Sequence, residues 1–158
     1  SRRQRQMCIR DSADTMNTVL NWPDRVLVIS QGDDATRWYY YRYELTAQVV
    51  NGFGGFYGRL GETQDRWDSD FMNLVESENW TLYDYKAVCV PDTLVAYMAE
   101  KDCDYILIDR ADDYLQREFS PLFEGGLTND MPATLYHFEG ADAAVPFTRA
   151  AVAESGVA

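Results

Sequence analysis

The stretch Val26-Leu27-Val28-Ile29-Ser30-Gln31-Gly32-Asp33-Asp34 decides the fold class. Its first four residues form a short apolar run bounded by turn-forming residues, a pattern typical of a buried parallel strand. The polar residues that follow predict a turn and then a helix over residues 35–45, with Asp33 or Asp34 as its N-cap. The stretch therefore indicates a strand followed by a helix.

A second apolar run, Tyr105-Ile106-Leu107-Ile108, ends in Asp109-Arg110 and is predicted to be another buried strand. The spacing of apolar residues elsewhere predicts strands over 46–50, 85–90, 134–139 and 145–149, and helices over 69–76, 91–101 and 112–119. The glycine-rich residues 51–58 predict a loop. Strands that alternate with helices indicate an α/β fold: a layered sandwich with a mainly parallel sheet, flanking helices and a C-terminal antiparallel hairpin.

The composition excludes several classes of protein. The chain has 158 residues, of which 46% are hydrophobic and 14% aromatic, so it can bury enough apolar surface to fold. Its net charge of −12 argues against a nucleic-acid partner, because phosphates require a basic surface. The sequence lacks a cysteine–histidine cluster for zinc and a phosphate-binding glycine motif. We therefore expect no cofactor and no metal.

The first residues differ sharply in charge from the rest of the chain. Residues 1–12 contain four basic residues and one acidic residue, and they resemble a translated sequencing adaptor. The alternative is a basic arm that contacts anionic lipid or nucleic acid. We expect residues 1–15 to be an artefactual or disordered tail, residues 16–150 to form a single α/β domain, and residues 151–158 to fray. We also expect the natural N-terminus to be missing, so that this domain is the end of a longer protein.

Polar residues gather where the two clearest strands end. In open α/β sheets, ligands bind beyond the carboxyl ends of the strands. The candidate binding residues there are Ser30, Gln31, Asp33, Asp34, Asp109 and Arg110. Such residues can hold a sugar through hydrogen bonds, and three carboxylates can in principle bind Mg²⁺. The alternative is purely structural: a glycine turn, a helix cap, and an ion pair between Asp109 and Arg110 or a neighbour.

Four consecutive aromatic residues, from Trp38 to Tyr41, lie within the predicted helix over residues 35–45, and Tyr43 follows. They cover every side of a helix, so some of them must contact a second surface: another domain, a membrane interface or a carbohydrate. Packing between the sheet and its flanking loops is the simpler interpretation. Trp38 is a further candidate binding residue.

The histidine and cysteines do not form a catalytic pattern. His137 lies in an alternating strand without a nucleophile motif, so we interpret it as a structural or surface residue. Cys89 and Cys103 both have apolar neighbours and are predicted to be buried free thiols, although a disulfide between them is the alternative. We identify no catalytic residue.

Four segments together resemble a known arrangement. They are Val26–Asp34 with the aromatic helix ending Arg42-Tyr43-Glu44-Leu45, then Asp104–Ile108, Tyr114–Phe123 and Thr134–Phe138. Their order resembles the soluble C-terminal domain of polytopic membrane proteins of Gram-positive bacteria that are similar to GT-C-type glycosyltransferases. The resemblance covers about residues 19–149, and Ser30-Gln31-Gly32-Asp33 is its most specific motif.

The resemblance implies a location and a role. Such proteins use lipid-linked sugar donors, and their reaction is expected in the membrane portion, so no catalytic residue is implied for this chain. We expect a non-catalytic domain on the extracytoplasmic face of the membrane that supports the membrane domain or places an acceptor glycan. Its partners would be the transmembrane portion of the same protein and a glycan. The alternative is a free-standing soluble α/β enzyme or a carbohydrate-binding module that uses residues 30–34 and the aromatic residues.

Overall fold

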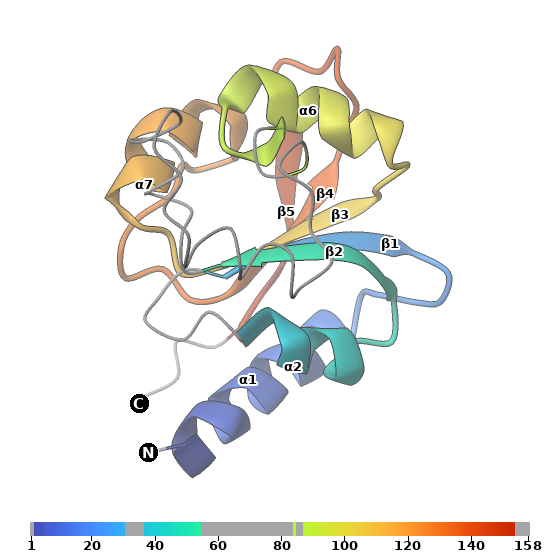
Figure 1. The fold of residues 1–158 in the computed structure, drawn as a ribbon, viewed down its shortest axis with the longest axis vertical. Helices are drawn as coiled ribbons and strands as arrows, with labels where there is room; N and C mark the ends of the chain where they lie inside the picture. The colour runs from blue at the N-terminus through green and yellow to red at the C-terminus, as the bar shows by residue number, and fades with distance from the viewer. Residues whose placement is uncertain (1, 31–36, 55–83, 85–86, 154–158) are drawn as a thin grey trace, which may run out of the picture.

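A five-stranded sheet forms the centre of the molecule (Figure 1). This computed structural model describes residues 2–30, 37–54, 84 and 87–153. The strands lie in the order β2-β1-β3-β4-β5. Their bounds are Arg25–Ser30 for β1, Gln48–Gly54 for β2, Tyr105–Asp109 for β3, Thr134–Phe138 for β4 and Phe147–Val152 for β5.

The sheet is parallel at one end and antiparallel at the other. Strand β1 pairs in parallel with both β2 and β3, whereas β4 runs antiparallel to β3 and to β5. The predicted mixture of helices and strands around a partly parallel sheet is thus confirmed. The parallel part is limited to three strands, because β4 runs opposite to β3.

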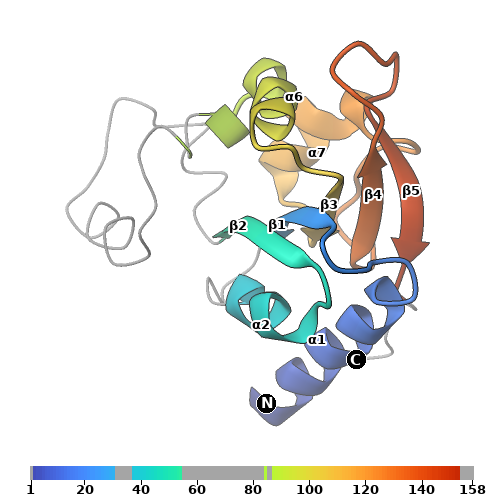
Figure 2. The same cartoon turned by 90° about the vertical axis from the view of Figure 1, so that its right-hand side faces the viewer.

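Helices lie on both sides of the sheet. Figure 2 shows α1 (Arg2–Met16) and α2 (Arg37–Glu44) on one side, and α6 (Pro91–Glu100) and α7 (Asp113–Phe119) on the other. A short 3₁₀ helix, η1 (Ser120–Leu122), follows α7. The ends of α6 and α7 follow from local chemistry. Proline begins α6, where its missing N–H costs nothing, and the Asp112 carboxylate accepts a hydrogen bond of 2.8 Å from the Leu115 backbone N–H.

The core explains why the two central strands are continuous apolar runs. Val26–Ile29 in β1 and Ile106–Ile108 in β3 are all completely buried. A central strand covered by helices on both faces has no exposed side, so an alternating pattern is not needed. On the side of α7, the Phe123 ring centroid lies 4.8 Å from that of Tyr136 and 4.6 Å from that of Phe147.

The N-terminal segment forms α1 in the structure, and Ile9, Ala13 and Met16 are buried in the core. These residues are spaced by four and three positions, which puts them on one face of the helix. The side chain of Asn17 then joins this segment to α2 by donating a 2.9 Å hydrogen bond to the Glu44 carbonyl. That residues 1–15 are an artefactual or disordered tail stays a prediction.

Two predicted elements have a different conformation. The glycine-rich residues 51–54 belong to β2 rather than to a loop, and Gly52 and Gly54 pair with Val28 and Ser30 of β1. An edge strand tolerates such glycines. Residues 87 and 88 are helical and lead into α6, so the predicted strand over 85–90 is wrong there. A short buried apolar run fits either a strand or a helical turn, which explains this error.

The C-terminal strand continues beyond the predicted end of the domain. Ala151 and Val152 pair with β4, and the Ala153 N–H donates a 2.9 Å hydrogen bond to the Ala133 carbonyl. Residues 151–153 are thus joined to β4 and its preceding residue, while fraying of residues 151–158 stays a prediction. Residues 154–158, and the predicted helix over 69–76, lie outside the described residues.

One glycine has a conformation that few other residues adopt. Gly125 has a φ of +79°, which residues with a side chain rarely adopt. A Cβ atom at this position would be 2.7 Å from Nη2 of Arg149, which is shorter than any real contact of this kind. Because Nη2 ends a flexible side chain that can move, the left-handed backbone is the main reason for glycine here.

Candidate functional site

The carboxyl ends of β1 and β3 form a topological switch point. From β1 the chain passes through α2 to reach β2 on one side, and from β2 it passes through α6 on the opposite face to reach β3. The connections therefore diverge between β1 and β3, where the ends of the two strands lie side by side (Figure 2). Ligands of open α/β sheets bind at such a point.

Two predicted residues meet at this switch point. Ser30 is the last residue of β1 and pairs with Asp109, the last residue of β3. The Ser30 hydroxyl donates a 3.3 Å hydrogen bond to Oδ2 of Asp109. Ser30 is 1% exposed and Asp109 is 4% exposed. A buried carboxylate is costly unless hydrogen bonds compensate its lost hydration. The hydrogen bond from Ser30 offsets part of this cost for Asp109, in a sheet that is otherwise apolar here.

Arg110 follows immediately and turns the chain away from the sheet. Its φ is +67°, the left-handed region that residues other than glycine rarely adopt. Its side chain is exposed, in contrast to the burial of Asp109 beside it. Ala111 is buried again, and Asp112 then caps α7. The turn thus brings a guanidinium-bearing residue to the surface directly beside the buried pair.

The remaining candidates are not all placed. Gln31, Asp33 and Asp34 lie outside the described residues, so the predicted helix cap falls there as well. Trp38 lies in α2, where only its backbone is described. In the same helix Tyr41 is completely buried and Tyr43 is 80% exposed. The aromatic residues therefore do face different surroundings, as their consecutive positions predicted.

The groups at this edge suit hydrogen bonding to a polar ligand. A carboxylate only accepts hydrogen bonds, whereas a serine hydroxyl both donates and accepts them. In the part of the chain that the structure describes, no group of three or more histidine, cysteine or acidic side chains is arranged to hold a metal ion.

The histidine lies in β4, beside the amino end of β3 and opposite the end that carries Asp109. His137 pairs with Tyr105, the first residue of β3. Asp109 is four residues further along β3, about 13 Å away at the usual rise of ~3.3 Å per residue. Nδ1 of His137 lies 3.0 Å from Oε1 of Glu139, and Thr148 donates a 2.6 Å hydrogen bond to the same oxygen. The hydroxyl of Thr148 first, and then His137, hold the pKa of Glu139 below its usual value.

A buried polar contact between β2 and α6 was not predicted. The amide of Asn51 donates a 3.4 Å hydrogen bond to the hydroxyl of Tyr97, which is 2% exposed. Burial raises the pKa of Tyr97 well above its usual value of 10. The sequence held a partial signal, since Tyr97 is on the predicted apolar face of α6. The glycines around Asn51 predict a loop, however, so the sequence gives no reason to place Asn51 beside Tyr97.

The cysteines agree with their prediction. Cys89 and Cys103 are both free and buried. Desolvation, as the largest cause, raises the pKa of the Cys103 thiol to about 12. A thiol of this kind is unreactive, which is consistent with a structural role.

Comparisons with known proteins do not add to this description. The chain matches no protein-family model, no curated protein and no solved structure. Among the described residues, no helix combines the length and apolar character that crossing a membrane requires. The functional argument therefore depends on the geometry of the site and on the resemblance of its sequence segments.

Proposed function

We propose that this chain is a non-catalytic domain that holds a hydroxylated ligand, a glycan, at the carboxyl ends of β1 and β3. The observation that carries the proposal is the buried hydrogen bond between Ser30 and Asp109 at the topological switch point. A sugar hydroxyl can donate to the Asp109 carboxylate or to the Ser30 oxygen, because the one Ser30 proton is already donated to Asp109. Arg110, exposed beside them, supplies further donors to the same ligand.

The wider setting comes from the resemblance of the sequence. The domain would lie on the extracytoplasmic face of the membrane, in a protein similar to GT-C-type glycosyltransferases. There it would contact the transmembrane portion of the same protein and place an acceptor glycan for cell-surface glycan synthesis. The proposal includes a layered α/β sandwich, with the C-terminal β4 and β5 as its hairpin and helices on both faces.

A binding role fits this site better than catalysis. A serine nucleophile needs a base within hydrogen-bond distance, and the described partner of Ser30 is a buried carboxylate. His137 is about 13 Å along the strands, at the rise per residue of a sheet. The site therefore provides groups that orient a ligand rather than a nucleophile paired with an imidazole.

A sugar titration followed by NMR tests the binding role. Glucose, rhamnose and N-acetylglucosamine are titrated separately into the whole chain, and backbone amide shifts are followed. At least one sugar should shift residues 29–30 and 108–111 in a saturable way. Asp109→Asn keeps the volume of the side chain and an acceptor for Ser30 but removes the charge, and it should weaken that binding severalfold because hydrogen bonds to charged groups are the stronger ones.

Asp102→Asn is the matched control. Asp102 is exposed, lies before β3 rather than after it, and has a φ of +53°, which asparagine accepts readily. It should leave sugar binding unchanged. Equal binding by the wild type and by Asp109→Asn, or shifts confined to other parts of the chain, would contradict the proposal.

The membrane setting has a separate test. The coding sequence upstream of the codon for Met16 should continue in frame and encode several hydrophobic helices. An in-frame stop codon there would contradict the membrane setting, while the sugar titration would still decide whether the site binds.

A further inference from the structure

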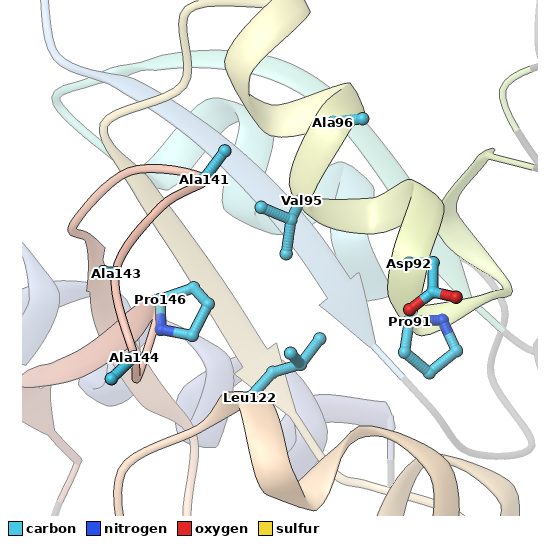
Figure 3. Close-up of a pocket in the computed structure, with 9 residues that line it drawn as sticks. All are labelled: Pro91, Asp92, Val95, Ala96, Leu122, Ala141, Ala143, Ala144 and Pro146. Carbon is cyan, nitrogen blue, oxygen red and sulfur yellow. The ribbon is translucent and has the colours of Figure 1, made fainter.

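A pocket lies on the side of the sheet covered by α6 and α7, and its lining includes neither Ser30 nor Asp109 (Figure 3). Its volume is about 370 Å³. It is bounded by α6, by η1 and by the connection between β4 and β5. The lining residues are Pro91, Asp92, Val95 and Ala96 of α6, Leu122 of η1, and Ala141, Ala143, Ala144 and Pro146 of the connection.

The pocket is open because its walls carry short side chains on a well-fixed backbone. The connection between β4 and β5 contributes three alanines, none of which is long enough to fill the space. The Glu139 N–H donates a 2.7 Å hydrogen bond to the Pro146 carbonyl, which closes the base of this connection. On the other wall, Pro91 begins α6 with a fixed φ. The space therefore exists without a rearrangement of the chain.

The chemistry of the lining is apolar with a single charge. Figure 3 shows Val95 and Leu122 pointing into the middle of the pocket, with Asp92 at one end and the alanines opposite. Asp92 is the one charged residue among the nine, and its side chain is exposed. The lining contains no aromatic ring, so it lacks the flat surface on which sugars stack. This pocket thus differs in kind from the site of Ser30 and Asp109.

We propose that this pocket binds a small aliphatic ammonium ion. The ammonium group pairs with the Asp92 carboxylate, and the alkyl chain packs against Val95, Leu122 and Pro146. The volume falls in the range of small-molecule sites, about 300–1,000 Å³. The net charge of −12 on the chain also attracts cations to its surface.

A titration with n-pentylammonium tests this inference directly, with 1-pentanol and pentanoate as neutral and anionic analogues of the same length. The whole chain is labelled with ¹⁵N, and amide shifts are recorded. We expect weak, saturable binding of n-pentylammonium that shifts residues 91–96, 122 and 141–146. 1-Pentanol should bind more weakly and pentanoate should not bind, because Asp92 repels it.

Two variants separate the charge from the cavity. Asp92→Asn should weaken n-pentylammonium binding about two- to fivefold, the effect of losing an exposed ion pair. Ala143→Leu fills the space and should abolish binding of both n-pentylammonium and 1-pentanol. Glu100→Gln removes one negative charge from the far end of α6, outside the lining, and is the matched control that should leave binding unchanged.

The proposal is overturned if n-pentylammonium causes no saturable shift at the lining residues. It is also overturned if Asp92→Asn and Glu100→Gln weaken binding equally, since the attraction would then be that of an acidic surface in general. Circular dichroism of each variant establishes that it is folded before its binding is interpreted.

Discussion

Two polar contacts of similar kinds lie near opposite ends of β3, in very different surroundings: one at Asp109, the last residue of β3, and one at His137, the β4 partner of its first residue. At the carboxyl end, Asp109 accepts a hydrogen bond from Ser30, and both side chains are almost completely buried. At the other end, Glu139 accepts from Thr148 and contacts His137, and the side chains of Glu139 and His137 are more than 40% exposed. The comparison teaches that burial, rather than the count of hydrogen bonds, decides what a polar pair contributes.

Cys103 gives the largest expected effect, because it is buried at the otherwise exposed end. Its thiol pKa is raised to about 12, so the thiolate that reacts with disulfide reagents is scarce at pH 8. The third cysteine of the chain is Cys8, and replacing it with serine leaves only the buried Cys89 and Cys103. In this Cys8→Ser background, DTNB should label the folded chain orders of magnitude more slowly than the chain in denaturant. Fast labelling of Cys103 in the folded chain would contradict this prediction, because it would show that the reagent reaches a thiol that is buried in the structure.

Asp109→Ala should produce the largest change in stability at the buried end. The substitution leaves the Ser30 hydroxyl buried without this acceptor and creates a void, so the free energy of unfolding should fall by about 1–3 kcal/mol. Urea unfolding followed by circular dichroism measures it. Asp109→Asn, which retains an acceptor and the volume, should lose clearly less. Equal losses for the two variants would mean that the charge, rather than the hydrogen bond, matters at this position.

Ser30→Ala removes the other partner and should have a smaller effect. The Asp109 carboxylate loses this donor, but the void is smaller than in Asp109→Ala and Asp109 has further interactions, so we expect a loss of about 1 kcal/mol in the same urea experiment. Thr148→Val, which removes the hydroxyl that bonds Glu139 at the exposed end, is the matched control and should cost less. A larger loss for Thr148→Val than for Ser30→Ala would reverse the comparison between the two ends.

Glu139→Gln should have the smallest effect and should change the pH dependence of stability. The folded pKa of Glu139 is lowered, so the unfolded chain binds a proton at a higher pH than the folded one. The contribution is fully present above the usual pKa of 4.5 and is lost as the pH falls through the lowered folded value. Melting temperatures between pH 2.5 and 6 should show that the wild type loses more stability over this window than Glu139→Gln. Parallel curves would contradict the assignment.

The sequence allowed the central strands to be predicted, and with them part of the site. The apolar runs before Ser30 and before Asp109 are unbroken because both faces are covered, and this pattern has few other interpretations. Since both runs were expected in one parallel sheet, their ends were expected at one edge. Ser30 and Asp109 do lie together at that edge, but their hydrogen bond does not follow from the sequence pattern.

Other features could not be predicted because they depend on distant partners. Glycine favours loops locally, yet Gly52 is in β2 because β1 offers it a pairing partner. The contact of Asn51 with Tyr97 joins residues that are 46 positions apart. The N-terminal segment shows the same limit, since its charge indicates a tail while Ile9 and Ala13 are buried on one helix face. Local composition contains none of this information.

The positive φ of Gly125 implies a signature that related sequences should carry. A Cβ at position 125 would lie 2.7 Å from Nη2 of Arg149, but this atom ends a flexible side chain and can move, so the backbone is the stronger restriction. Glycine is thus expected at position 125 across descendants of a common ancestor, whereas position 149 can vary. A glycine kept at this turn would identify true relatives more reliably than the apolar strands, which many α/β chains share.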